Sequence, residues 1–176
     1  MQSCSRKREH GTRRRGDTVS LRKWGRPVRA VIQRVSEASV TVAGEMLGAI
    51  NRGLLVYLGV DRDDGETDAA FIAHKVRNLR IFPDDEGKMN RNVADASGAV
   101  LVVSAFTVSA DARKGHRPTF DTACEPERAR VLYEQVCRAL RDSGVPVEQG
   151  SFGDEMQVAS TNAGPICILL ESKKLF

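Results

Sequence analysis

The run Asn162-Ala163-Gly164-Pro165-Ile166-Cys167, close to the C-terminus, is the most informative feature of this chain. Proline has no backbone N–H and a fixed φ, and the bond before a proline is the common place for a cis peptide. The apolar run Ile166–Leu170 indicates a buried strand. We therefore predict that Gly164-Pro165 forms a rigid turn, which opens this strand and holds two carbonyl groups at a fixed angle.

A second run, Ser104-Ala105-Phe106-Thr107-Val108, lies about sixty residues earlier. It follows the apolar run Val100–Val103, which is typical of a buried strand. The strand therefore ends in two hydroxyl groups and an aromatic ring. Together, the two runs predict a small polar pocket built on rigid strand ends.

With these two runs, the chain resembles the D-aminoacyl-tRNA deacylases, whose signatures read Ser-Gln-Phe-Thr and Asn-x-Gly-Pro-x-Thr. Both signatures occur in order and at a spacing like that of the family, and the resemblance extends from about Arg29 to Leu170. Further stretches carry it: Val31–Val35, Gly53–Val60, Arg80–Phe82, Gly87–Asn90, Arg117–Phe120 and Met156–Val158.

The pattern of apolar residues predicts an α+β fold: a single compact domain with a mainly antiparallel sheet or barrel-like core and two flanking helices. The resemblance implies the same barrel-like core. Pro126 suits the first turn of the second helix, and Gly144 suits its C-terminal cap. The expected strands are Arg29–Val35, Ala38–Val42, Met46–Ile50, Leu54–Val60, Val100–Phe106, Val145–Val147, Glu155–Ser160 and Ile166–Leu170, and the expected helices are Thr67–Leu79 and Glu125–Ser143.

Length and charge divide the chain into an extension and a body. The 176 residues, 41% hydrophobic and 28% charged, suit one globular domain. Residues 1–28 hold nine Lys or Arg and two acids, whereas the remainder holds 18 basic and 21 acidic residues. We expect 1–27 to be disordered, either as a basic arm for RNA, a transit peptide or a start-site artefact. The last is favoured because the family-like body, 28–176, begins at Val28, whose codon could serve as an alternative start read as Met.

The cysteines and the hydropathy bear on compartment and cofactors. The four cysteines are scattered, and no Cys-x-x-Cys pair or metal-ligand spacing is present. No apolar run is long enough for a transmembrane helix or suited to a signal peptide. We predict reduced thiols, a cytoplasmic location, no membrane association, and neither metal nor cofactor.

The resemblance implies hydrolysis of the ester that joins a D-amino acid to the 3′-terminal adenosine of tRNA, as a chiral proofreading step. Ester hydrolysis needs a nucleophile and stabilisation of the oxyanion. No Ser-His-Asp order is visible, and His74 and His116 are isolated. We assign catalysis to the run from Ser104 to Thr107.

Within this run, Thr107 carries the hydroxyl best placed to attack or to position the ester, although it could simply close a strand end. A threonine hydroxyl is a weak nucleophile without an adjacent base. We favour the backbone N–H groups of Ala105, Phe106 and Thr107 as donors to the substrate carbonyl. The resemblance further implies that the 2′-hydroxyl of the tRNA assists water.

Gly164 and Pro165 carry the chiral selection that the resemblance implies. In the family this pair is cis and reaches into the pocket of the partner subunit in a homodimer, where its carbonyls exclude L-amino acids by clash. A thousandfold selectivity requires about 4 kcal/mol. Because glycine has no Cβ, glycyl-tRNA is an expected second substrate. A trans Gly-Pro turn without this role is the alternative.

Other residues are expected to support the substrate site. Arg34 is assigned to holding the Gly-Pro turn through its guanidinium group, and Asn162 belongs to the same signature. Phe106 shapes the pocket or stacks on the terminal adenine, and Met156 lines the adenosine pocket, with core packing as the alternative for both. The candidate phosphate contacts are Lys88, Arg113, Lys114 and Arg117.

Three positions depart from the family signatures. Ala105 stands where glutamine is usual, Ala163 where an acid is common, and Cys167 where threonine is usual. Loss of the glutamine removes an amide that could orient the substrate. Two alternatives therefore remain open: a deacylase of the same fold for a different misacylated tRNA, and a non-catalytic module that binds the tRNA 3′ end.

Overall fold

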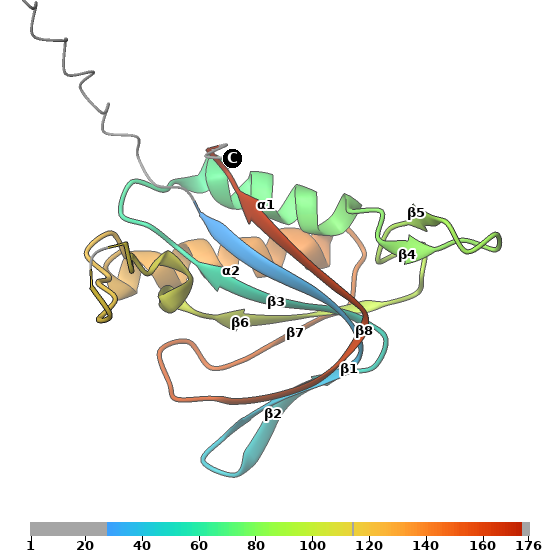
Figure 1. The fold of residues 1–176 in the computed structure, drawn as a ribbon, viewed down its shortest axis with the longest axis horizontal. Coiled ribbons are helices and arrows are strands. Elements are labelled where there is room, and N and C mark those ends of the chain that lie inside the picture. Colours follow the sequence, from blue (N-terminus) through green and yellow to red (C-terminus); the bar gives the residue numbers. More distant parts are fainter. Residues whose placement is uncertain (1–27, 114, 174–176) are drawn as a thin grey trace, which may run out of the picture.

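A strongly curved sheet with two helices on one face forms the body of the protein (Figure 1). The computed structural model describes residues 28–113 and 115–173. The elements run in the order β1 (Arg29–Val42), β2 (Glu45–Ile50), β3 (Gly53–Gly59), α1 (Glu66–Asn78), β4 (Phe82–Pro83), β5 (Met89–Arg91), β6 (Ala99–Ser104), the 3-10 helix η1 (Phe106–Ser109), α2 (Pro126–Asp142), β7 (Val147–Gln149) and β8 (Gln157–Glu171). The predicted α+β class with a barrel-like sheet and two helices is confirmed, whereas the expected extension 1–27 lies outside the described residues.

The long strand β1 connects the two ends of the sheet. It pairs antiparallel with β3 through Arg29–Val35 and with β2 through Ala38–Val42, while β8 pairs with it on the opposite edge over nearly its whole length. The two strands expected within 29–42 are therefore one strand. Ser172, just after β8, donates its N–H to the Val28 carbonyl at 3.1 Å, so the first and last strands also meet at their outer ends.

The other half of the sheet is parallel. Strand β3 pairs parallel with β6, and β6 pairs parallel with β7. The near-continuous apolar run of β3 suits this arrangement because strands of a parallel sheet are buried on both faces. Leu54, Val56 and Leu58 pack with the helices on one face, whereas Leu55 packs on the other face with Leu101.

The two helices begin and end close to their predicted positions. Helix α1 has Gly65 as its N-cap, and the Asp68 carboxylate accepts the Gly65 N–H at 3.1 Å. Helix α2 has Pro126 at its first position, and Gly144 just beyond its C-terminal cap has a φ of +82°. The predicted positions of this proline and this glycine are therefore confirmed, as is the buried apolar stripe of α2.

Strand β8 differs from its prediction in two ways. The expected strands Glu155–Ser160 and Ile166–Leu170 form one strand, and Gly164-Pro165 lies within its bounds. The pair occupies a break in the register, between Asn162, which pairs with Val35, and Cys167, which pairs with Gln33. Residues 166–170 alternate between half-buried and exposed, and the Leu169 side chain is 60% exposed. The expectation of a buried strand holds for one face only, because only that face of β8 packs on the core.

Among residues 28–113 and 115–173, no helix is long and apolar enough to cross a membrane.

Candidate functional site

A cleft of about 870 Å³ opens where β3 and β6 end, between η1 and the N-terminal part of α2. All four residues from Ser104 to Thr107 line it, and so does Met156 from the segment before β8. The structure thus brings together the predicted catalytic run and the residue predicted to line an adenosine pocket.

The run from Ser104 to Thr107 passes from strand into helix within one residue. Ser104 ends β6, and Ala105 is the N-cap residue of η1, with a φ of −147° and a ψ of 84°. The Ala105 N–H donates to the Leu58 carbonyl at 2.9 Å, which continues the pairing of β3 with β6. This N–H was expected to bind the substrate oxygen, and that expectation was wrong because the sheet already uses it.

Phe106 and Thr107 remain as the candidate donors. They are the first two residues of η1, and the leading N–H groups of a helix have no carbonyl partner inside it. The carbonyls of Ala105 and Thr107 accept the N–H groups of Val108 and Ala110, both at 3.1 Å, which fixes the turn. Both side chains are exposed, that of Phe106 at 60%, as a group that meets substrate must be.

Aromatic rings form much of the wall of the cleft. The ring of Phe120 packs edge-on against that of Phe106, with centroids 5.2 Å apart at an angle of 74°. On the other side, Phe152 packs against Tyr133, whose hydroxyl donates to the Val102 carbonyl at 2.8 Å. An apolar wall of this kind favours a planar or apolar group over a bare phosphate.

Burial raises the pKa of three side chains that line the cleft. Burial raises the pKa of the Cys124 thiol and of the Tyr57 hydroxyl, and it raises the pKa of Tyr133 strongly. Nearby, burial raises the pKa of Cys137 to about 11. The raised pKa disfavours the thiolate form of Cys124, and among the described residues no histidine lines the cleft.

Within the described part of the chain, no group of three or more His, Cys, Asp and Glu is arranged to hold a metal ion.

The second predicted group lies on β8, apart from the cleft. Gly164-Pro165 is cis and exposed, and neither it nor Asn162 lines the cleft of its own chain. Arg34, on β1, donates from Nε to the Ala163 carbonyl at 2.9 Å and from Nη1 to the Ile81 carbonyl at 2.5 Å. The contact expected between Arg34 and the Gly-Pro segment is thus present, while its function stays a prediction.

Gly164 has little room for a side chain. Its φ is +137°, and a Cβ built on it would lie 2.9 Å from Ile166 and 3.2 Å from Arg34 Nη2. The position therefore requires glycine for both conformation and space.

The predicted phosphate contacts lie in two other places. Lys88 belongs to the β4–β5 hairpin and pairs with Glu86 at 2.6 Å. Arg113 pairs with Asp111 at 2.5 Å, in the loop that also carries the exposed Arg117. None of these three lines the cleft, and Lys114 lies outside the described residues.

Sequence reasoning missed Phe152 and Tyr133 as parts of the site. Tyr133 follows Leu132 on the buried side of α2, and a hydroxyl among such apolar residues was an available signal. Phe152 lies in an irregular segment, where no periodicity points to its partner.

Comparisons with known proteins agree on one family. The family model described as "D-Tyr-tRNA(Tyr) deacylase" matches residues 31–171. A D-aminoacyl-tRNA deacylase of Anaeromyxobacter dehalogenans (strain 2CP-C) is 57% identical over 149 residues, which cover 85% of this chain and 100% of that protein. One of Thermus aquaticus is 51% identical over 147 residues, which cover 84% of this chain and 97% of that protein.

Solved structures share the fold. That of a "c-Myc DNA Unwinding Element Binding Protein" is 40% identical with a TM-score of 0.77, and the match covers 81% of this chain and 97% of that one. A probable eukaryotic D-amino acid tRNA deacylase is 14% identical with a TM-score of 0.71, over 82% of this chain and 98% of that one. At 14% identity, the second shows the fold alone.

Proposed function

The chain belongs to the D-Tyr-tRNA(Tyr) deacylase family, and from this premise we propose that it hydrolyses the ester bond of D-aminoacyl-tRNA, releasing free tRNA and the D-amino acid. The observation that carries the proposal is the cleft on which Ser104–Thr107 and Met156 converge. Its apolar walls suit the terminal adenosine and the amino-acid side chain. The activity belongs in the cytoplasm, where aminoacyl-tRNA is made and used.

The chemistry of the cleft favours attack by water. Among the described residues no histidine lines the cleft with Thr107, and burial raises the pKa of the Cys124 thiol, which disfavours the nucleophilic thiolate. The amides of Phe106 and Thr107 then stabilise the tetrahedral oxyanion, and the 2′-hydroxyl of the substrate assists water. Removal of one such donor typically costs about 2.7–4 kcal/mol of transition-state stabilisation.

Chiral selection requires a second copy of the chain. We propose that Gly164-Pro165 of one subunit enters the cleft of its partner and rejects L-amino acids by backbone clash. Three observations support this: the pair is exposed, Arg34 fixes the carbonyl that precedes it, and it does not line the cleft of its own chain. The exposed apolar Leu169 on the same strand suits a dimer interface.

The proposed activity is tested by hydrolysis of D-tyrosyl-tRNA against L-tyrosyl-tRNA, with a chelator present. We expect rapid cleavage of the D-ester and a preference of about a thousandfold, which corresponds to roughly 4 kcal/mol. Cleavage of neither ester would refute the proposal. Glycyl-tRNA is the next substrate, because glycine has no Cβ for the filter to meet; resistance of this ester would show that the filter works in another way.

The exchange of the Gly-Pro segment between subunits is tested with mixed dimers. One subunit carries a cleft variant without activity, and the other carries Gly164→Val in an intact cleft. If the filter comes from the partner, the only active cleft receives a normal Gly-Pro segment and spares L-tyrosyl-tRNA. Cleavage of L-tyrosyl-tRNA by the mixed dimer would instead show that each chain filters its own cleft.

A second candidate function is binding of nucleic acid without cleavage. The 40% identical protein is named for binding DNA, and in this chain Ala105 replaces the usual glutamine of the signature. This candidate predicts tRNA binding with a strong salt dependence and no ester cleavage. The assay above separates the two functions, since only the first releases the amino acid.

A further inference from the structure

The turn between β3 and α1 is unusual because it buries acidic side chains. This acidic turn, Asp61–Gly65, carries three aspartates, and acidic residues are almost never fully buried unless they are paired. Yet Asp61 is 1% exposed and Asp64 is 0% exposed. Buried carboxyl groups cost stability unless other groups bind them, so the partners of this turn indicate what it is for.

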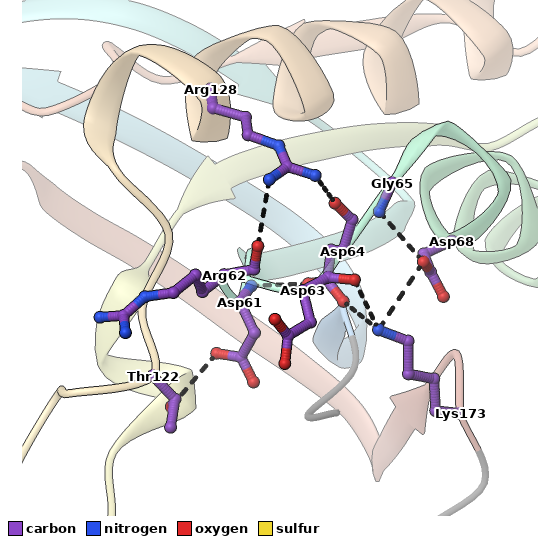
Figure 2. Close-up of polar contacts among 9 residues, drawn as sticks. All are labelled: Asp61, Arg62, Asp63, Asp64, Gly65, Asp68, Thr122, Arg128 and Lys173. Carbon is purple, nitrogen blue, oxygen red and sulfur yellow. Dashed lines mark hydrogen bonds and ion pairs between the residues drawn. The ribbon is translucent and has the colours of Figure 1, made fainter. Parts of the chain in front are cut away.

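Two cations from distant parts of the chain hold the acidic turn, as Figure 2 shows. Lys173, after β8, pairs with the Asp64 carboxylate at 3.2 Å and donates to the Asp63 carbonyl at 2.9 Å. Arg128, on α2, donates to the Asp64 carbonyl at 2.5 Å and to the Arg62 carbonyl at 3.2 Å. The Asp64 carboxylate also accepts the Asp61 N–H at 2.6 Å, which closes the turn on itself.

The same acidic turn also binds the segment Phe120–Cys124, which precedes α2. The Arg62 N–H donates to the Thr122 carbonyl at 2.9 Å, and the Arg62 guanidinium donates to the Asp121 carbonyl at 2.9 Å. Asp61 forms a β-bridge with Ala123, and the Cys124 N–H donates to the Val60 carbonyl at 3.0 Å. The position of the segment Phe120–Cys124 is therefore set by the acidic turn.

This segment is a wall of the cleft. Phe120, Ala123 and Cys124 all line it, and the Phe120 ring packs against Phe106 on η1. A continuous series of contacts thus leads from Arg128 through the turn and the wall to the helix whose amides are the candidate oxyanion donors. Neither Arg128 nor any residue of the acidic turn lines the cleft.

We propose that Arg128 and Asp64 are positioning residues, which hold the Phe120–Cys124 wall, and through it Phe106, where deacylation requires them. The inference rests on the proposed function and adds residues to it that lie outside the two signature runs. Arg128 is suited to the task because its planar guanidinium reaches two carbonyls at once, whereas a lysine offers a single ammonium group.

The test compares Arg128→Ala, Arg128→Lys and Asp64→Asn with the unchanged protein in steady-state cleavage of D-tyrosyl-tRNA. Arg138→Ala is the matched control, since Arg138 is an exposed arginine on the same helix. We expect kcat/KM to fall about tenfold in Arg128→Ala, with at least a threefold rise in KM, and to recover partly in Arg128→Lys. Asp64→Asn keeps an acceptor for the Asp61 N–H and loses the ion pair, so its KM should rise less.

The change in KM is the decisive readout. Partial unfolding reduces the amount of active enzyme and lowers the apparent kcat, but it leaves KM unchanged. If Arg128→Ala does not fold, Arg128→Lys and Asp64→Asn carry the test. A KM within twofold of the unchanged protein in every folded variant would overturn the inference.

A failure of the proposed function looks different, because the unchanged protein would then cleave no ester. The positioning role can still be judged in that case from the NMR amide shifts of Phe106 and Thr107. They should move in Arg128→Lys and stay fixed in Arg138→Ala; equal spectra would refute the role.

Discussion

The cleft around η1 and the exposed face of β8 carry the two parts of the proposed site, and they are supported in opposite ways. The cleft is held from behind by the chain itself, through the Tyr133 hydroxyl, the acidic turn and the pairing of Ala105 with Leu58. The β8 segment lies against β1 on one side only, and Arg34 is the side chain that fixes its Gly-Pro segment.

Under the proposed function, this difference implies that one chain would complete the catalytic part of the site but would need a second copy for the selective part. A segment fixed in conformation and left exposed is suited to meet something outside its own chain. Four variants or sets of variants test this difference between the cleft and β8, in order of decreasing expected effect.

The largest effect is expected from Leu169→Asp, which places a charge on the exposed face of β8. If a second copy covers this face, the dimer should dissociate and activity at low protein concentration should fall at least 100-fold. Val131→Asp is the matched control, because Val131 on α2 is 63% exposed and Leu169 is 60% exposed. Sedimentation measures the dissociation, and cleavage of D-tyrosyl-tRNA measures the activity. Equal behaviour of the two variants would show that the exposed face of β8 is not a dimer interface.

Arg34→Ala tests the β8 segment separately from the cleft, because it removes the side chain that binds the Gly-Pro segment and leaves the cleft intact. Hydrogen bonds to a charged group contribute about 1.5–3 kcal/mol each, so the preference for D- over L-tyrosyl-tRNA should fall 10- to 100-fold. Cleavage of the D-ester should change less than threefold. An unchanged preference would show that Arg34 only joins β1 to the segment after α1.

Gly59→Ala against Thr107→Ala separates main-chain from side-chain function in the cleft. A Cβ on Gly59 would lie 3.0 Å from the Ala105 carbonyl and 3.2 Å from Val108 Cβ, so it should push η1 out of place. We expect kcat to fall about tenfold in Gly59→Ala and less than threefold in Thr107→Ala. The opposite order would make the Thr107 hydroxyl the reacting group.

The smallest effect concerns the pH dependence of the support behind the cleft. Burial raises the pKa of Asp64 from 3.8 to about 6, against the opposing effects of the Asp61 N–H and of Lys173. Asp61 and Lys173 face its carboxylate, while Arg128 binds its carbonyl and Asp68 lies at 3.9 Å from Lys173.

Because folding favours protonated Asp64, its contribution to stability is full below about pH 4 and is lost as the pH rises through 6. Asp64→Asn should therefore gain stability relative to the unchanged protein between pH 4.5 and 7, by on the order of 1 kcal/mol. Urea unfolding at three pH values measures this. A relative loss over that range would mean that the ion pair with Lys173 outweighs burial.

Much of the fold could be predicted because its signals are local. The run Leu54–Val60 gave a buried strand, and Pro126 with Gly144 bounded α2. The direction of pairing is not a local property, so the parallel arrangement of β3, β6 and β7 could not be predicted. The short β4–β5 hairpin was missed because two and three residues show no periodicity.

The parts of the candidate site that belong to a sequence motif could be predicted. The parts that arise from packing between distant segments could not. The runs at Ser104 and Gly164 pointed to two groups, and only the family resemblance, not the residue pattern, indicated that they lie apart within one chain. Gly164-Pro165 was interpreted as a turn that opens a strand, whereas β1 pairs with β8 on both sides of it, at Asn162 and at Cys167. The buried Asp64 was missed because its pairing with Lys173 spans most of the chain.

The pairing of β1 with β8 also has a consequence for how the molecule is made. The paired residues include Arg29 with Glu171 and Ala30 with Leu170. These contacts join residues that are separated by nearly the whole sequence of the body. Contacts between residues so distant in sequence form slowly, because a long loop must close before they can stabilise the fold. Until the last strand arrives, one edge of β1 stays open, and a polypeptide stalled before β8 would present it to other chains as an aggregation-prone edge.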